Sequence, residues 1–267
     1  MRDTSWTFEP VVVVWLAAFA VVYTFGLFRL WSTAGTGKGI SRAQAAAFAG
    51  GWLTLVLALM SPLDRISDSL FSAHMIQHEL LMVVAAPLVA ASSPLVAATW
   101  LLRKRRQIPR RLHRPVMILA TAPAFVWVLH GMILWVWHLP LLFEGAMAHE
   151  LLHGFQHFTF FTSACLFWWG LAHGRYGRLG YGAAVFYLFA TGLHSGVLGA
   201  LLTFSPAIWY PVYAATTSAW GYTPIEDQQL AGLVMWIPAS LVFLVGGLAF
   251  FVEWLRESER RQSSVSN

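Results

Sequence analysis

The chain has 267 residues, of which 58% are hydrophobic and 11% are charged. A soluble domain carries about 25% charged residues, so this composition excludes a soluble globular protein and indicates an integral membrane protein. The net charge of +5 does not indicate nucleic-acid binding, because the basic residues are confined to a few loops. The single cysteine, Cys165, excludes an intrachain disulfide and a site built from several thiolates.

Seven segments are long and apolar enough, or nearly so, to cross a bilayer, which takes about 20 mostly apolar residues. The third contains Pro87 and Pro94, which predict a kink or a break. The first lacks a basic stretch before it, so we expect a retained helix and not a removed signal. The sequence predicts an all-α, integral membrane bundle of seven transmembrane helices, a single domain over residues 1–255, with a polar cytoplasmic tail over residues 256–267. In chain order the segments are residues 11–30, 44–60, 74–102, 116–138, 149–172, 182–204 and 230–255.

The basic residues predict the orientation. They follow the first, third, fifth and seventh segments, which leaves only Arg2 and Arg65 on the opposite side. Cytoplasmic loops of membrane proteins carry the excess of Lys and Arg. We therefore expect the N-terminus outside and the C-terminus in the cytoplasm of a multi-pass membrane protein.

Eight of the ten histidines fall in the outer half of the membrane in this topology. His74 and His78 are four residues apart, so a helix places both imidazoles on one face. Polar groups within a membrane normally face the bundle interior, so several of these histidines are expected to converge on one site. The remaining six are His130, His138, His149, His153, His157 and His194.

Imidazole with thioether suits copper, and imidazole with carboxylate suits zinc or iron. Met75 and Met235 are candidates for the first, and Asp227, just before the last segment, for the second. The same Asp227 is an equally good candidate for helix capping. The long outer loop before the last segment is rich in aromatic residues, and it is a candidate to cap the site.

Three other functions are open at this point. His130 and His194 are suited to bind haem axially in a membrane redox protein. His149, Glu150 and His153 match the HExxH pattern of a zinc protease, in which the glutamate is the general base. A metal transporter would need ligands that continue to the cytoplasmic side, where the chain offers mainly Cys165 and His173, and no inverted repeat is evident.

Three blocks of the sequence, in the same order, resemble those of the CtaG family of cytochrome c oxidase assembly factors, the polytopic kind associated with caa-type oxidases. The paired histidines of the first block are His74 and His78, and His138 lies in the WHLP motif of the second. Asp227 and Met235 lie in the third. The blocks read SPLDRISDSLFSAHMIQHELLMVVAAPL, WHLPLLFEGAMAHELLHGFQHFTFFTSACLFWW and EDQQLAGLVMWIPASLVFL.

The resemblance covers residues 44–255 and implies a seven-helix, multi-pass protein of the bacterial plasma membrane that is needed to build active terminal oxidase. It also implies that copper destined for the oxidase is handled by the chain, that cytochrome c oxidase subunits are its partners, and that it is not an enzyme. Together with the histidine placement, this predicts a copper site in the outer leaflet. The sequence does not indicate the oligomeric state.

Overall fold

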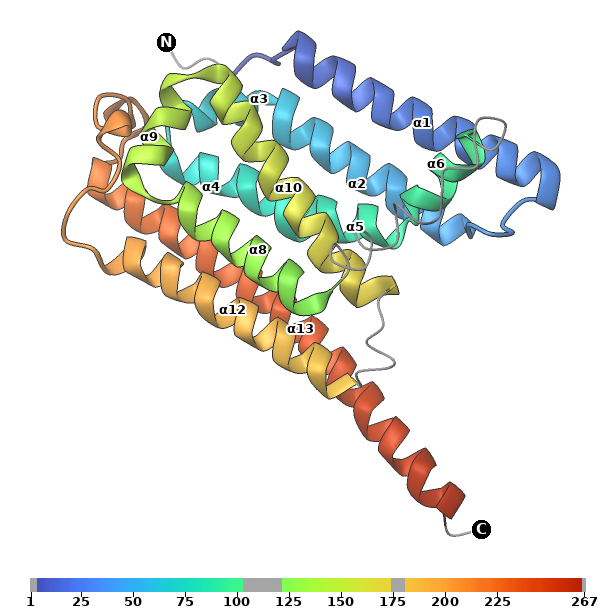
Figure 1. The fold of residues 1–267 in the computed structure, drawn as a ribbon. Helices are drawn as coiled ribbons and strands as arrows, with labels where there is room; N and C mark the ends of the chain where they lie inside the picture. Colours follow the sequence, from blue (N-terminus) through green and yellow to red (C-terminus); the bar gives the residue numbers. More distant parts are fainter. Residues whose placement is uncertain (1–3, 103–121, 174–180, 266–267) are drawn as a thin grey trace.

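The computed structural model describes residues 4–102, 122–173 and 181–265, and every regular element within these ranges is helical. The arginine-rich loop, His113, the beginning of the fourth predicted segment, Arg175 and Arg178 lie outside them. The main helices are α1 (Pro10–Ala34), α2 (Arg42–Met60), α3 (Pro62–Ser67), α4 (Phe71–Glu79), α5 (Ala86–Ala91), α6 (Pro94–Leu102), α8 (Pro123–Trp137), α9 (Pro140–Ala148), α10 (Glu150–His173), α12 (Tyr181–Phe204) and α13 (Pro224–Val265) (Figure 1).

Proline marks the start of many of these helices, because its fixed φ suits the first turn and its missing N–H is not needed there. The helices that begin with proline are α1, α3, α6, α8, α9 and α13. The second helix has a full capping box: Ser41 accepts from the backbone of Gln44, and the Gln44 side chain accepts from the backbone of Ser41. Local sequence therefore sets most of the helix boundaries.

The predicted break in the third segment is present. Helix α4 continues into a π-helical segment, η1 (Leu80–Ala85), then into α5, and the chain breaks at Ser92 and Ser93 before α6. Pro87 lacks the N–H that a carbonyl of η1 would accept. The indole of Trp168 on α10 instead donates to the carbonyl of Met82 at 2.9 Å, as side chains of neighbouring helices do for proline-interrupted membrane helices.

Five helices are long and apolar enough to cross a membrane, and six if the bent pair α8 and α9 counts as one span. The five begin at residues 10, 42, 71, 181 and 224. The two helices of the pair meet at 73° around His138. Thus the structure is that of a multi-pass helical membrane protein with five or six candidate spans in its described part, where the sequence predicted seven.

Close helix crossings depend on glycine. At the crossing of α12 and α13, a Cβ on Gly199 would lie 2.9 Å from the carbonyl oxygen of Gly232, and one on Gly232 would lie 2.6 Å from that of Gly199. On the other side of the molecule, a Cβ on Gly26 of α1 would lie 2.1 Å from the carbonyl oxygen of Ala97 on α6. Glycine at these positions allows the backbones to approach, as is usual between membrane helices.

Several chain segments meet at one end of the bundle. The backbone N–H of Thr7 donates to Met60 at the end of α2, and the Thr216 hydroxyl donates to the carbonyl of Ser69. The hydroxyl of Tyr210, in the long loop after α12, donates to the carbonyl of His138 at 2.7 Å. This end therefore brings together the start of α1, the end of α2, the bend between α8 and α9 and the loop before α13 (Figure 1).

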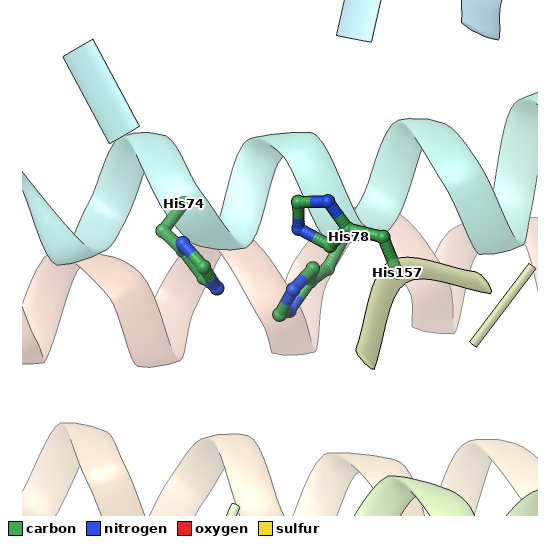
Figure 2. A group of neighbouring side chains, drawn as sticks. All are labelled: His74, His78 and His157. Atoms are coloured by element: carbon green, nitrogen blue, oxygen red, sulfur yellow. The ribbon is translucent and has the colours of Figure 1, made fainter. Parts of the chain in front are cut away.

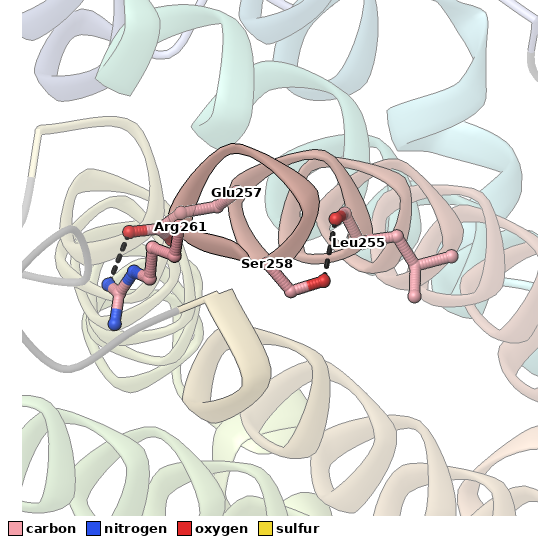
Figure 3. Close-up of polar contacts among 4 residues, drawn as sticks. All are labelled: Leu255, Glu257, Ser258 and Arg261. Carbon is pink, nitrogen blue, oxygen red and sulfur yellow. Dashed lines mark hydrogen bonds and ion pairs between the residues drawn. The ribbon is translucent and has the colours of Figure 1, made fainter. Parts of the chain in front are cut away.

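The polar C-terminal residues continue α13 as a helix that extends beyond the rest of the bundle (Figure 1). Arg261 pairs with Glu257 one turn earlier at 2.5 Å, and the hydroxyl of Ser258 donates to the carbonyl of Leu255 (Figure 3). Exposed pairs at this spacing add only about 0.3–0.5 kcal/mol. They support the helix locally and do not dock it on the bundle.

Candidate metal centre

Three histidines from two helices form the centre of the site. His74 and His78 on α4 and His157 on α10 each place a ring nitrogen within 4.8 Å of the others. Their exposed fractions are 0%, 1% and 8%. Figure 2 shows the three imidazoles facing one another between the two helices. The spacing of four residues on α4 accounts for the first two, and the packing of α10 beside this segment supplies the third.

Two more imidazoles adjoin these three. The ring of His153 lies 4.3 Å from that of His157 and 5.2 Å from that of His74, between centroids. The ring of His138, at the bend between α8 and α9, lies 6.3 Å from that of His78. We call these five residues, His74, His78, His138, His153 and His157, the histidine cluster.

The ring nitrogens of the cluster are poorly satisfied by protein groups. Both ring nitrogens of His74 and of His78 are buried and have no hydrogen-bond partner among the described residues. The same holds for the Nε2 atoms of His138, His153 and His157. A buried polar atom without a partner costs about 1–3 kcal/mol. A metal ion that accepts the lone pair of one nitrogen in each ring would remove part of that cost.

A backbone hydrogen bond fixes which nitrogen of His138 is free to bind a metal. Its Nδ1 atom lies 2.7 Å from the carbonyl oxygen of Leu134, one turn earlier. A carbonyl only accepts, so Nδ1 carries the proton and donates, and the lone pair is on Nε2. A hydrogen bond of this kind fixes the tautomer and the ring orientation of a metal-binding histidine.

Aromatic side chains surround the cluster. The ring of Phe143 lies 5.2 Å from His74, and that of Phe160 lies 4.6 Å from His78. Both phenylalanines are fully buried. Tyr210 of the long loop packs on Phe143 at 4.1 Å between centroids, so this loop covers the cluster. These side chains make this side of the cluster apolar.

Asp227 holds the start of α4. The N-cap residue of this helix is Leu70, which offers no capping side chain. The buried carboxylate of Asp227 on α13 instead accepts from the backbone N–H of Phe71 at 2.7 Å and from the N–H and hydroxyl of Ser72 at 3.1 and 2.5 Å. A carboxylate at a helix N-terminus also complements the helix dipole. Asp227 therefore positions the turn that carries His74, while Thr223 and Glu226 cap α13 itself.

The glutamine between the paired histidines was missed by the sequence reasoning. The amide of Gln77 donates to the carbonyl of Ala58 and to the carboxylate of Asp64, both at 2.8 Å, and Asp64 also accepts from the hydroxyl of Thr7. Gln156, beside His157, is fully buried. A polar amide within an apolar membrane segment costs free energy and normally faces the interior of the bundle. The presence of Gln77 and Gln156 in apolar segments could therefore have identified both as site residues from the sequence.

The remaining candidates lie elsewhere. His130 contacts the hydroxyl of Ser163 at 3.1 Å. His194 accepts from the indole of Trp135 at 3.4 Å and lies against Gly131. These two histidines form a separate group, outside the three that share one site. Met75 and Met235 are buried in the hydrophobic core on α4 and α13.

The HExxH pattern is not formed on one helix face. His149 ends α9 with extended backbone dihedrals, precedes the first residue of α10 and is exposed. His153 faces the cluster instead. A zinc protease of this type needs both histidines one turn apart on one helix, so the structure gives the pattern no support.

The chemistry of the donor set is that of neutral nitrogen ligands. Imidazole suits copper, zinc, iron and nickel, and a set of three leaves a position open for exchange. The group of metal-binding side chains found in the described residues contains no carboxylate. The arrangement is therefore suited to hold a soft or borderline metal ion in an apolar environment.

Comparison with known proteins finds relatives in three mycobacteria. It is 23% identical to an uncharacterized protein of Mycobacterium leprae, and 24% identical to uncharacterized proteins of Mycobacterium bovis and Mycobacterium tuberculosis. Each alignment covers 96% of this chain and 40% of the relative. The chain thus spans about two fifths of the length of the curated relatives it matches. No solved structure matches it.

The model of the family described as cytochrome c oxidase caa3 assembly factor (Caa3_CtaG) matches residues 21–257. This range contains every residue of the histidine cluster and the residues that position it, except Thr7. The chain therefore belongs to the caa3-type cytochrome c oxidase assembly factor family.

Proposed function

We propose that this protein binds copper in the histidine cluster and delivers it to a subunit of cytochrome c oxidase during assembly of the oxidase. The observation that carries the proposal is the buried group of His74, His78 and His157, whose nitrogens lie within 4.8 Å of one another. Family membership supplies the oxidase as the partner, and the cluster supplies a reason for the association.

Copper is favoured over zinc by the partner. Three imidazoles suit copper as well as zinc, so the donor set is compatible with both metals. Cytochrome c oxidases contain copper within the membrane, beside a haem. A membrane protein that assembles the oxidase and presents buried imidazoles is therefore well suited to carry that copper.

Delivery requires ligands that exchange. The ring centroid of His153 lies 4.3 Å from that of His157, and the ring centroid of His138 lies 6.3 Å from that of His78. An ion can therefore change one ligand at a time without leaving the cluster. A closed four-ligand cage would retain its metal. The surplus of imidazoles supports a carrier and not a permanent metal site.

The topology that we propose has seven spans, with the cluster in the outer leaflet, the N-terminus outside and the C-terminus in the cytoplasm of a bacterium. Helix α10 would be the seventh span: its 24 residues extend about 36 Å at 1.5 Å per residue. Its polar residues include His153 and His157, which belong to the cluster, and these residues make it less apolar than the helices counted above.

Copper binding is tested with detergent-purified protein loaded anaerobically with Cu(I). We expect about one copper per chain, and at least a tenfold loss of retained copper in the double variant His74→Ala and His78→Ala. His149→Ala is the matched control, because His149 is exposed, and it should keep its copper. Equal retention by the double variant would refute the proposal. An absorption spectrum of the same sample should show no Soret band, since a Soret band would instead support haem binding by His130 and His194.

A further inference from the structure

A cleft leads from the surface of the molecule to the histidine cluster. It lies between the beginning of α1, the end of α2 and the first three turns of α10, with a volume of about 300 Å³. Glu9 and Glu150, both exposed, lie at the starts of α1 and α10. Trp15, Phe158 and Phe161 are among the apolar residues that line the rest.

His157 also lines the cleft. It is 8% exposed and its Nε2 atom has no hydrogen-bond partner among the described residues. The other two members of the central three, His74 and His78, are more deeply buried. Along α10, His157 lies seven residues beyond Glu150, which is about 10 Å at 1.5 Å per residue. A single wall of the cleft therefore connects an exposed carboxylate with an imidazole of the candidate metal site.

The two carboxyl groups at the opening act together. The carboxyl groups of Glu9 and Glu150 lie close enough to interact electrostatically. The pKa of Glu9, which precedes α1, is raised from its ordinary value by partial burial, then by the negative charge of Glu150 and of Asp64. Mutual repulsion of this kind is relieved when a cation binds between the carboxylates.

We propose that this cleft is the route by which the metal ion reaches and leaves the histidine cluster, with Glu9 and Glu150 as its first ligands and His157 as the next. This inference rests on the proposed copper binding. Because most of the wall is apolar, an ion that enters the cleft loses water that the wall does not replace. A singly charged ion loses less hydration free energy than a doubly charged one, so the route favours Cu(I) over Zn²⁺.

A competing route passes along the beginning of α10, from the exposed His149 to His153 of the cluster. The two routes use different faces of the helix. Gly154 lines the cleft, and a Cβ added to it would meet no atom within 4 Å. A larger side chain at Gly154 therefore fills the cleft and leaves the route along His149 open.

The first experiment measures the rate of Cu(I) loading by stopped-flow competition with a chromophoric chelator. Gly154→Leu should slow loading at least tenfold while the copper bound at equilibrium stays the same. Gly154→Ala, which leaves the cleft open, and His149→Ala should both load at the original rate. Unchanged loading in Gly154→Leu together with slow loading in His149→Ala would overturn the proposal in favour of the other route.

The second experiment does not depend on copper. Cys165→Ala removes the natural thiol, and Gly154→Cys in that background places a thiol in the cleft. A cationic methanethiosulfonate reagent should modify it at least fivefold faster than an anionic one, and Glu9→Gln with Glu150→Gln should abolish the difference. Absence of a preference for the cationic reagent would overturn the cleft as a cation route. Failure of the original protein to retain Cu(I) would overturn the proposed function instead, whatever the labelling shows.

Discussion

Replacement of Asp227 by asparagine tests whether the start of α4 depends on a carboxylate from α13. The carboxylate accepts three hydrogen bonds, one through Oδ2 from Phe71 and two through Oδ1 from Ser72. Asparagine keeps one acceptor oxygen and turns an amide N–H₂ toward the remaining donor, so at least one bond is lost. Hydrogen bonds to charged groups contribute about 1.5–3 kcal/mol each. Relief from burying a charge offsets part of the loss, and we expect Asp227→Asn to lower the free energy of unfolding by about 2–4 kcal/mol.

The assay is unfolding by SDS of protein solubilised in a mild detergent, followed by circular dichroism, together with Cu(I) affinity. His74 lies three residues after Phe71, so loosening of this turn should also weaken Cu(I) binding by about tenfold, or about 1.4 kcal/mol. Glu226→Gln is the matched control, because Glu226 is the neighbouring acid and is exposed. Its unfolding midpoint should stay that of the original protein, because glutamine keeps an acceptor oxygen for the Thr223 N–H that Glu226 binds at the start of α13. If Asp227→Asn unfolds and binds copper like the control, then the carboxylate does not position α4.

Three further outcomes are expected. Trp168→Phe leaves the buried carbonyl of Met82 without its indole donor, so it should cost about 1–3 kcal/mol in the same SDS titration; an unchanged midpoint would contradict this role. Gly232→Ala forces the backbones of α12 and α13 apart and should cost about 1–3 kcal/mol, whereas Gly154→Ala in open space should have little effect. Glu9→Gln should raise stability at pH 7, because a carboxyl whose pKa is raised on folding is destabilising above that pKa. This gain in stability should vanish below pH 4.5, the ordinary pKa of glutamate, because the carboxyl is then protonated in both the folded and the unfolded state. A gain that persists below pH 4.5 would show that the raised pKa of Glu9 is not its cause.

Much of this molecule follows from local sequence. Apolar segments of membrane length predict a helical membrane protein, and the structure has five or six such spans in its described part. In the described part of the chain, proline begins six α-helices and Ser41 caps a seventh. Pro87 and Pro94 predict a break in the third segment, and the chain breaks just before Pro94. The pairing of His74 with His78 follows from the helical repeat alone, since it depends on no contact outside α4.

The identity of the third imidazole depended on the tertiary structure. His149, His153 and His157 are equally spaced in the sequence, yet the first is exposed at a helix junction while the other two face α4. His130 and His194 have the depth to join but lie with Ser163 and Trp135 instead. Periodicity gives the face of each helix, but it does not give the rotation of one helix against another.

The role of Asp227 also depended on the tertiary structure. Its sequence position, at the start of the last helix, suggests a cap for that helix or a metal ligand, yet its carboxylate caps α4, which begins 156 residues earlier. No local pattern contains the contact between Asp227 and the start of α4. This contact exists only because α13 packs on α4 and brings the starts of the two helices together. Hydrophobic pattern and proline determined which segments are helices. Side-chain packing between those helices determined which polar groups meet, because a buried polar group is stable only where another element supplies its partner.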